Sequence, residues 1–130
     1  MKKKIIFLFD LDGVLIDSKK NMKLSWQELT KRYKLKVPFS NYFSLIGSPF
    51  LKILSKLKID KELHSALEKE YKKNSIKNIK LIKLQKGVKK TFLKLKLKKK
   101  IIGILTSKEK SRTLKILKIN KIKVDVVLCP

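Results

Sequence analysis

The chain has 130 residues, 43% of them hydrophobic, and a formal net charge of +25 at pH 7. This length allows one domain with a small insertion, and the hydrophobic fraction is sufficient for a folded core. So high a charge would ordinarily favour a nucleic acid or an anionic membrane as the partner. However, 33 of the 35 basic residues are lysines spread along the chain, whereas nucleic-acid recognition relies on arginine. We interpret the lysines as solvated helix faces and expect no dedicated nucleic-acid partner.

The sequence also bears on the compartment. Cys129 is the only cysteine, so no intrachain disulfide can form, which suits a reducing environment. The first apolar run, residues 5–9, is shorter than the 7–15 residues that a signal peptide needs. No stretch approaches the 18 apolar residues of a membrane span. We therefore expect a cytoplasmic protein that does not interact with membranes.

The first expected element is a strand over Ile5–Phe9, which is continuously apolar and rich in β-branched and aromatic residues. Such a run is typical of a strand buried on both faces of a parallel sheet. Asp10 and Asp12 follow where the strand ends, and Gly13 allows a turn that can expose backbone N–H groups. Open α/β sheets bind ligands at the carboxyl ends of their strands, so these carboxylates are candidate functional groups.

The stretch from Ser18 to Leu84 is lysine-rich, predominantly helical in pattern and free of clear strand signals. Met22, Trp26, Leu29 and Tyr33 form one apolar helical stripe, which indicates packing side chains. The only histidine, His64, has no Cys or His companion and is expected at the surface or its boundary. The expected helices cover about 21–33, 49–57 and 60–73, with a short helix or turn over 39–46 and a helical end and linker over 74–86.

The last part of the chain returns to an alternation of helix and strand. Gly87 opens a helix, and Ile101–Leu105 has the pattern of a second buried strand. Thr106 and Ser107 follow that strand, and a further helix begins at about Glu109. A hydroxyl beside backbone N–H groups at a helix start can bind phosphate, although the same pattern is often only a helix cap. A third strand is expected over 123–128.

Two of these stretches resemble motifs of the haloacid dehalogenase-like phosphohydrolases, particularly phosphoglycolate phosphatase-like members. Phe9–Ser18 (FDLDGVLIDS) resembles the first motif, and Ile101–Thr106 resembles the second. The resemblance implies an α/β fold: a Rossmann-like parallel sheet, incomplete with three strands, and an inserted α-helical cap. The expected boundaries are 1–17 and 85–130 for the core and 18–84 for the cap.

The same resemblance implies a phosphatase acting on a small phosphorylated metabolite through an aspartyl-phosphate intermediate. Asp10 is the implied nucleophile and Asp12 the implied general acid and base. Thr106, Ser107 and Gly13 are the implied phosphate-binding residues. The implied cofactor is Mg²⁺, held by Asp10 and by the backbone carbonyl of Asp12.

Two later elements of the family pattern, a lysine and a further group of acids, are not found in this sequence. Lys108, Lys118, Lys121 and Lys123 do not stand in the context expected for that lysine. We therefore expect weak metal binding and impaired activity, as in a truncated chain. A non-catalytic remnant or interaction subunit and a phosphomutase remain alternatives.

The resemblance also predicts the strand order. The other two strands are expected on one side of the strand at residues 5–9, which leaves its other edge without a partner. Such an apolar edge favours self-association or pairing with another chain.

Overall fold

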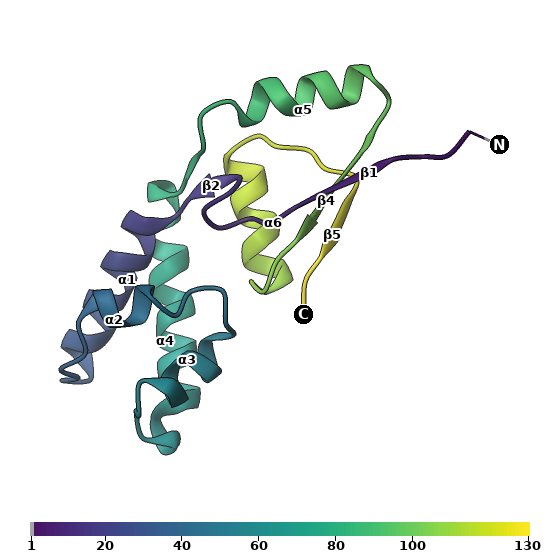
Figure 1. The fold of residues 1–130 in the computed structure, drawn as a ribbon. Helices are drawn as coiled ribbons and strands as arrows, with labels where there is room; N and C mark the ends of the chain where they lie inside the picture. The colour runs from purple at the N-terminus through teal and green to yellow at the C-terminus, as the bar shows by residue number, and fades with distance from the viewer. Residues whose placement is uncertain (1) are drawn as a thin grey trace. The chain divides into compact units, whose positions relative to one another are not determined.

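The computed structural model describes residues 2–130, which form two compact units (Figure 1). The first unit comprises residues 2–18 and 82–130, and the second comprises Lys19–Leu81. The first unit holds a sheet of three parallel strands in the order β1-β4-β5. These strands are β1 (Ile6–Phe9), β4 (Ile101–Leu105) and β5 (Val126–Leu128). The α/β class, the parallel sheet and the predicted strand order are confirmed.

The burial of β1 differs from the prediction. Ile6 and Leu8 are 54% and 53% exposed, and Phe7 is also exposed. β1 lies at the edge of the sheet, where only β4 pairs with it among residues 2–130, and side chains on both of its faces are left uncovered. By contrast, Ile102 and Ile104 in the middle strand are fully buried. The expected unpaired apolar edge is therefore present, and β1 is not buried on both faces.

Gly103 lets the three strands pack closely. A Cβ atom at this position would lie 2.6 Å from Leu8 Cδ2 and 2.7 Å from Val126 Cγ1. Real Cβ atoms do not come so close to other carbon atoms. Side chains from both neighbouring strands therefore fill the space that a side chain on β4 would need.

Two helices accompany this sheet. Helix α5 (Val88–Leu97) follows Gly87, whose φ of 89° favours glycine, and its Phe92 ring lies 5.4 Å from the Phe9 ring. Helix α6 (Lys110–Ile119) connects β4 to β5 and buries Ile116 and Leu117. A helical connection is the usual way to join two parallel neighbours.

A second, two-stranded pairing was not predicted. β2 (Ile16–Asp17) pairs antiparallel with β3 (Lys83–Leu84), and the Gln85 amide donates to the Leu15 carbonyl at 2.9 Å. The chain thus leaves and re-enters the first unit at paired positions, which lets residues 19–81 form an insertion. Segments of two residues carry too little periodicity to be recognised in the sequence.

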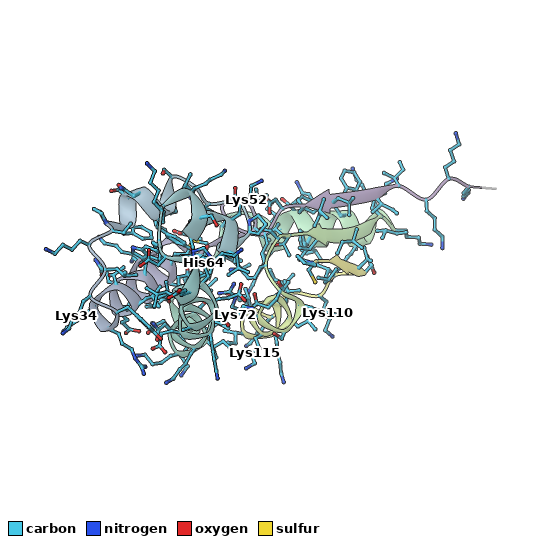
Figure 2. All side chains as sticks on the ribbon, turned by 90° about the horizontal axis from the view of Figure 1, so that it is seen from below. Lys34, Lys52, His64, Lys72, Lys110 and Lys115 are labelled. Atoms are coloured by element: carbon cyan, nitrogen blue, oxygen red, sulfur yellow. The ribbon has the colours of Figure 1, made fainter. Side chains whose placement is uncertain are left out.

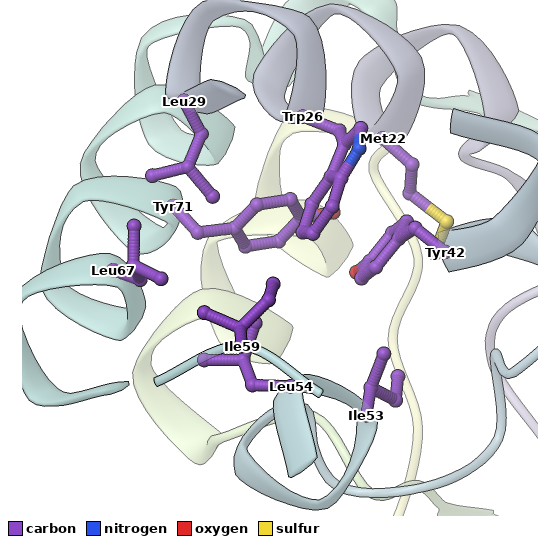
Figure 3. Packing of buried hydrophobic residues seen from close by; sticks show 9 residues of the cluster. All are labelled: Met22, Trp26, Leu29, Tyr42, Ile53, Leu54, Ile59, Leu67 and Tyr71. Carbon is purple, nitrogen blue, oxygen red and sulfur yellow. The ribbon is translucent and has the colours of Figure 1, made fainter. Parts of the chain in front are cut away.

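The inserted unit is built mainly from four α-helices: α1 (Lys19–Arg32), α2 (Phe39–Phe43), α3 (Phe50–Lys56) and α4 (His64–Lys77). Two short 3₁₀ turns, η1 (Lys61–Leu63) and η2 (Ile79–Leu81), precede and follow α4. Figure 3 shows its core, in which Trp26 stacks on Tyr42 with the ring centroids 4.4 Å apart. The Trp26 indole also donates to the Val37 carbonyl at 2.9 Å. The predicted stripe on the first helix therefore packs inside this unit.

His64 is buried rather than superficial. Its Nε2 atom lies 2.8 Å from the carbonyl oxygen of Ile59, and this hydrogen bond explains how a polar ring can be buried there.

The lysines lie mostly on the outside, as the labelled Lys34, Lys110 and Lys115 illustrate (Figure 2). Among residues 2–130, Lys72 and Lys100 are half-buried, Lys108 is buried, and every other lysine is exposed. Their distribution agrees with solvated helix faces. Within the same residues, no helix combines the length and the apolar character that crossing a bilayer requires.

Candidate active site

The loop after β1 is anchored by Leu11, which is fully buried. Its amide donates to Asp10 Oδ1 at 2.7 Å, and its carbonyl accepts the amides of Leu15 and Ile16 at 3.0 and 3.1 Å. Asp10 and Asp12 therefore flank a fixed residue, but they differ in environment. Asp10 is exposed, whereas Asp12 is half-buried.

Asp12 Oδ1 accepts two hydrogen bonds from side chains. The Ser18 hydroxyl donates at 2.7 Å, and the Lys108 ammonium donates at 3.1 Å. The second contact is also an ion pair in which the Lys108 and Asp12 side chains are 6% and 19% exposed. These bonds fix the orientation of the Asp12 carboxylate.

Gly13 requires a correction. Its φ of 79° provides the predicted turn, but its amide donates to the Ile16 carbonyl at 2.9 Å inside the loop. An N–H group that is already bonded within the loop is not available to a ligand. We therefore do not assign Gly13 to phosphate binding.

The loop after β4 presents Thr106 and Ser107. The Thr106 amide donates to the Leu128 carbonyl of β5 at 3.0 Å, and its Oγ1 accepts the Lys108 amide at 3.1 Å. Because that oxygen acts as an acceptor, the hydroxyl proton can still be donated to a ligand. Ser107 is exposed, and its amide has no hydrogen-bond partner within residues 2–130.

The sheet brings these two loops together. β1 and β4 are parallel neighbours, with Phe9 paired to Ile104, so both loops begin at the carboxyl ends of the strands. The Asp12–Lys108 contact then joins one loop to the other. Asp125 lies at the amino ends of the strands, where it precedes β5, and its carboxylate accepts a hydrogen bond from the Ile102 amide at 2.8 Å.

Lys108 was not predicted to take part in the site. Burial of its ammonium lowers the pKa of Lys108, whereas the charge of Asp12 raises this pKa and that of Arg112 lowers it. The available signal was its place two residues after the threonine that follows a buried strand. Its partner, Asp12, is 96 residues distant in the sequence, which no local pattern reveals.

The donor atoms near Asp10 are suitable for Mg²⁺ in kind, because this ion prefers oxygen ligands. The exposed Asp10 carboxylate and the Asp12 backbone carbonyl could supply two such ligands. Within residues 2–130, however, no group of three or more His, Cys, Asp or Glu side chains is placed to hold a metal. The described residues therefore provide a partial donor set.

Comparison with known proteins identifies the family. The model of the haloacid dehalogenase-like hydrolases matches residues 7–129. The chain belongs to the haloacid dehalogenase-like hydrolase family. The match covers nearly the whole of this chain, which confirms the resemblance indicated by the motif around Asp10. A search of the curated proteins found no match for this chain.

Solved structures of haloacid dehalogenase-like proteins share the fold. A family hydrolase from Streptococcus pneumoniae matches with a TM-score of 0.86 and 20% identity, over 98% of this chain and 61% of its own. A predicted phosphoglycolate phosphatase from Haemophilus somnus gives 0.78 and 20%, over 97% and 62%. A protein assigned as a β-phosphoglucomutase from Thermotoga maritima gives 0.68 and 19%, over 98% and 61%. The chain thus spans about three fifths of the length of each.

Proposed function

We propose that the site formed by Asp10, Asp12, Thr106 and Ser107 carries out phosphatase chemistry on a small phosphorylated metabolite. The observation that carries this proposal is the Asp12–Lys108 contact at 3.1 Å, which joins the loop after β1 to the loop after β4. The contact holds the loop of Asp10 and Asp12 against the loop of Thr106 at the carboxyl ends of two parallel strands, where α/β folds bind ligands.

In this proposal Asp10, which is exposed, attacks phosphorus and forms an aspartyl phosphate while the bond to the leaving oxygen breaks. Asp12 gives a proton to that leaving oxygen and later accepts one from the water that hydrolyses the intermediate. The Thr106 hydroxyl and the Ser107 amide donate hydrogen bonds to phosphoryl oxygens. Mg²⁺, when bound by Asp10 and the Asp12 carbonyl, would offset the repulsion between the carboxylate and the phosphate.

The substrate class follows from the same donors. A small phosphate ester fits the proposed chemistry, and the net charge of +25 attracts anions in general. The relatives described as a phosphoglycolate phosphatase and a β-phosphoglucomutase support this class. A phosphomutase would use the same nucleophile and the same acid, so it is the alternative catalytic hypothesis. We propose the cytoplasm as the compartment, because the single cysteine suits a reducing environment.

The test is hydrolysis of p-nitrophenyl phosphate with Mg²⁺ by the purified chain. We expect weak turnover, because the described residues offer a partial metal donor set. Asp10→Asn should remove that turnover, since an amide is a poor nucleophile. Asp60→Asn, at an exposed aspartate in the inserted unit, is the matched control and should leave it unchanged. Equal turnover in the wild type and in Asp10→Asn would refute the assignment.

An interaction role is the second candidate, and the edge of β1 favours it. Ile5, Ile6 and Leu8 are 50%, 54% and 53% exposed along a strand that pairs on one side only within residues 2–130. We propose that a second copy of the chain pairs with this edge. Because each copy carries +25 charges, salt should promote the pairing by screening their repulsion.

Sedimentation velocity at 50 and 500 mM NaCl tests the pairing. A dimer at high salt that is weakened by Ile6→Thr, but not by Leu97→Thr at an exposed helical position, would support pairing through β1. A monomer at both salt concentrations would overturn it.

A further inference from the structure

We propose that Lys108 is a phosphate-binding residue of this site, an inference that rests on the proposed function. It is the only buried lysine within residues 2–130, in a chain that has 33 lysines. A lysine side chain is rarely buried unless it is paired, because the ammonium loses its hydration. Lys108 lies in the loop after β4 and is paired with Asp12 of the loop after β1.

The ammonium of Lys108 has more hydrogen-bond donors than acceptors around it. It carries three N–H groups, and its one hydrogen-bond acceptor within residues 2–130 is Asp12 Oδ1, at 3.1 Å. Two N–H groups of a side chain that is 6% exposed thus have no protein acceptor in the described part of the chain. An anion with several oxygens can accept both of them. A phosphoryl group meets this requirement, since it offers three peripheral oxygens.

The neighbouring charges support the assignment. Arg112, a buried basic residue near Lys108, forms an ion pair with Glu109 through its Nε atom at 3.1 Å, and its Nη2 donates to Glu109 Oε2 at 3.2 Å. The Arg112 charge is therefore balanced by a carboxylate on the same turn. The Lys108 charge faces Asp12, a residue of the proposed reaction.

Lys108 also belongs to the proposed phosphate-binding loop. Its amide donates to Thr106 Oγ1 at 3.1 Å, so the backbone of Lys108 orients the hydroxyl that is proposed to bind phosphate. The segment Thr106–Lys108 thus offers a hydroxyl, the Ser107 amide and an ammonium within three residues. In the absence of ligand, the ammonium holds Asp12; with phosphate bound, it shares its donors between Asp12 and the phosphoryl oxygens.

The experiment measures binding of inorganic phosphate by NMR at constant ionic strength, without a reaction. Lys108→Met removes the charge while keeping an unbranched side chain, and Lys108→Arg retains the charge. Lys110→Met, at an exposed lysine two residues further on, is the matched control. Loss of a charge-assisted hydrogen bond should weaken phosphate binding about tenfold in Lys108→Met. Lys110→Met should bind as the wild type does, and Lys108→Arg should retain most of the affinity.

A second measurement is made on the wild type and uses a variant only to assign one signal. The ¹³Cε signal of Lys108 in the wild type, assigned by its loss in Lys108→Arg, should move on addition of phosphate, and that of Lys110 should not. Unchanged affinity in folded Lys108→Met, or an unmoved Lys108 signal while phosphate binds, would overturn the inference and leave the proposed function standing. A wild-type chain that binds no phosphate would overturn both.

Discussion

The Lys108 ammonium lies 3.1 Å from Asp12 Oδ1, although the two residues are 96 positions apart in the sequence. The lysine is the more deeply buried partner, with 6% of its side chain exposed against 19% for the aspartate. This asymmetry matters because an unpaired charge costs more when it is cut off from water. The two residues should therefore respond differently to substitution.

We expect Asp12→Asn to lower the free energy of unfolding by about 1–3 kcal/mol, because it leaves a buried ammonium without its carboxylate. Lys108→Met should cost less, since Asp12 retains the Ser18 hydroxyl and partial access to water. The double variant should cost less than the sum of the two single ones, with a coupling of about 1–2 kcal/mol. Urea unfolding of the four proteins measures this cycle.

The exposed pair between Lys77 and Glu28 provides the control cycle. Its atoms are separated by a similar distance, 3.2 Å, but its side chains are 63% and 30% exposed. Its coupling should stay below about 0.5 kcal/mol. Equal coupling in the two cycles would contradict the importance given to burial at Lys108.

The pKa of Lys108 can be measured by NMR titration. Burial lowers the pKa of Lys108, so its NMR titration midpoint in the metal-free protein should lie below the usual value of a solvated lysine. Because Asp12 raises this pKa, Asp12→Asn should lower the midpoint further. A midpoint at the usual lysine value would contradict the lowering of the pKa of Lys108 by burial.

The pKa of Lys108 is linked to stability. The unfolded chain holds the Lys108 proton more tightly than the folded chain, so unfolding takes up a proton between the two pKa values. The free energy of unfolding of the wild type, relative to Lys108→Met, should therefore rise as the pH increases from the folded pKa towards the unfolded one. Urea unfolding of both proteins at several alkaline pH values measures this difference.

Gly103→Ala should destabilise the sheet by about 1–3 kcal/mol, because the new methyl group would meet Leu8 and Val126. Combining it with Val126→Ala should recover part of the loss, since that change removes one of the two clashing atoms. Thermal unfolding measures both effects. A neutral Gly103→Ala variant would show that the Leu8 and Val126 side chains, or the strands that carry them, can shift without cost.

In the inserted unit, Trp26→Ala should cost about 3–5 kcal/mol, because it removes a fully buried ring stacked on Tyr42. Trp26→Phe should cost less, since it keeps an aromatic ring but leaves the Val37 carbonyl without the indole donor. Leu93→Ala, at a side chain that is 59% exposed, is the control and should be close to neutral. Urea unfolding followed by circular dichroism distinguishes the three.

The sequence predicted the elements that follow from local patterns. Trp26 and Leu29 lie on a regular helical stripe, and both are fully buried. Asp12 and Thr106 each follow an apolar run that was predicted to be a strand of a parallel sheet, and the contacts of Lys108 connect their loops.

Features that depend on tertiary contacts could not be predicted from local sequence patterns. The apolar pattern of β1 indicated burial, but the exposure of Ile6 depends on which elements neighbour the strand and cover its faces. The Gly13 amide looked available because its bond to Ile16 is formed only once the loop closes. Lys108 is one lysine among many in the sequence, and only its burial beside Asp12 distinguishes it.

The central claim is that the loops after β1 and β4 form one phosphate site. Its most direct test follows the backbone amides by ¹H–¹⁵N NMR while inorganic phosphate is added at constant ionic strength. We predict that the amides of residues 10–13 and 106–108 shift together and give one dissociation constant. Shifts confined to one loop, or scattered over exposed lysines with no common constant, would contradict the claim.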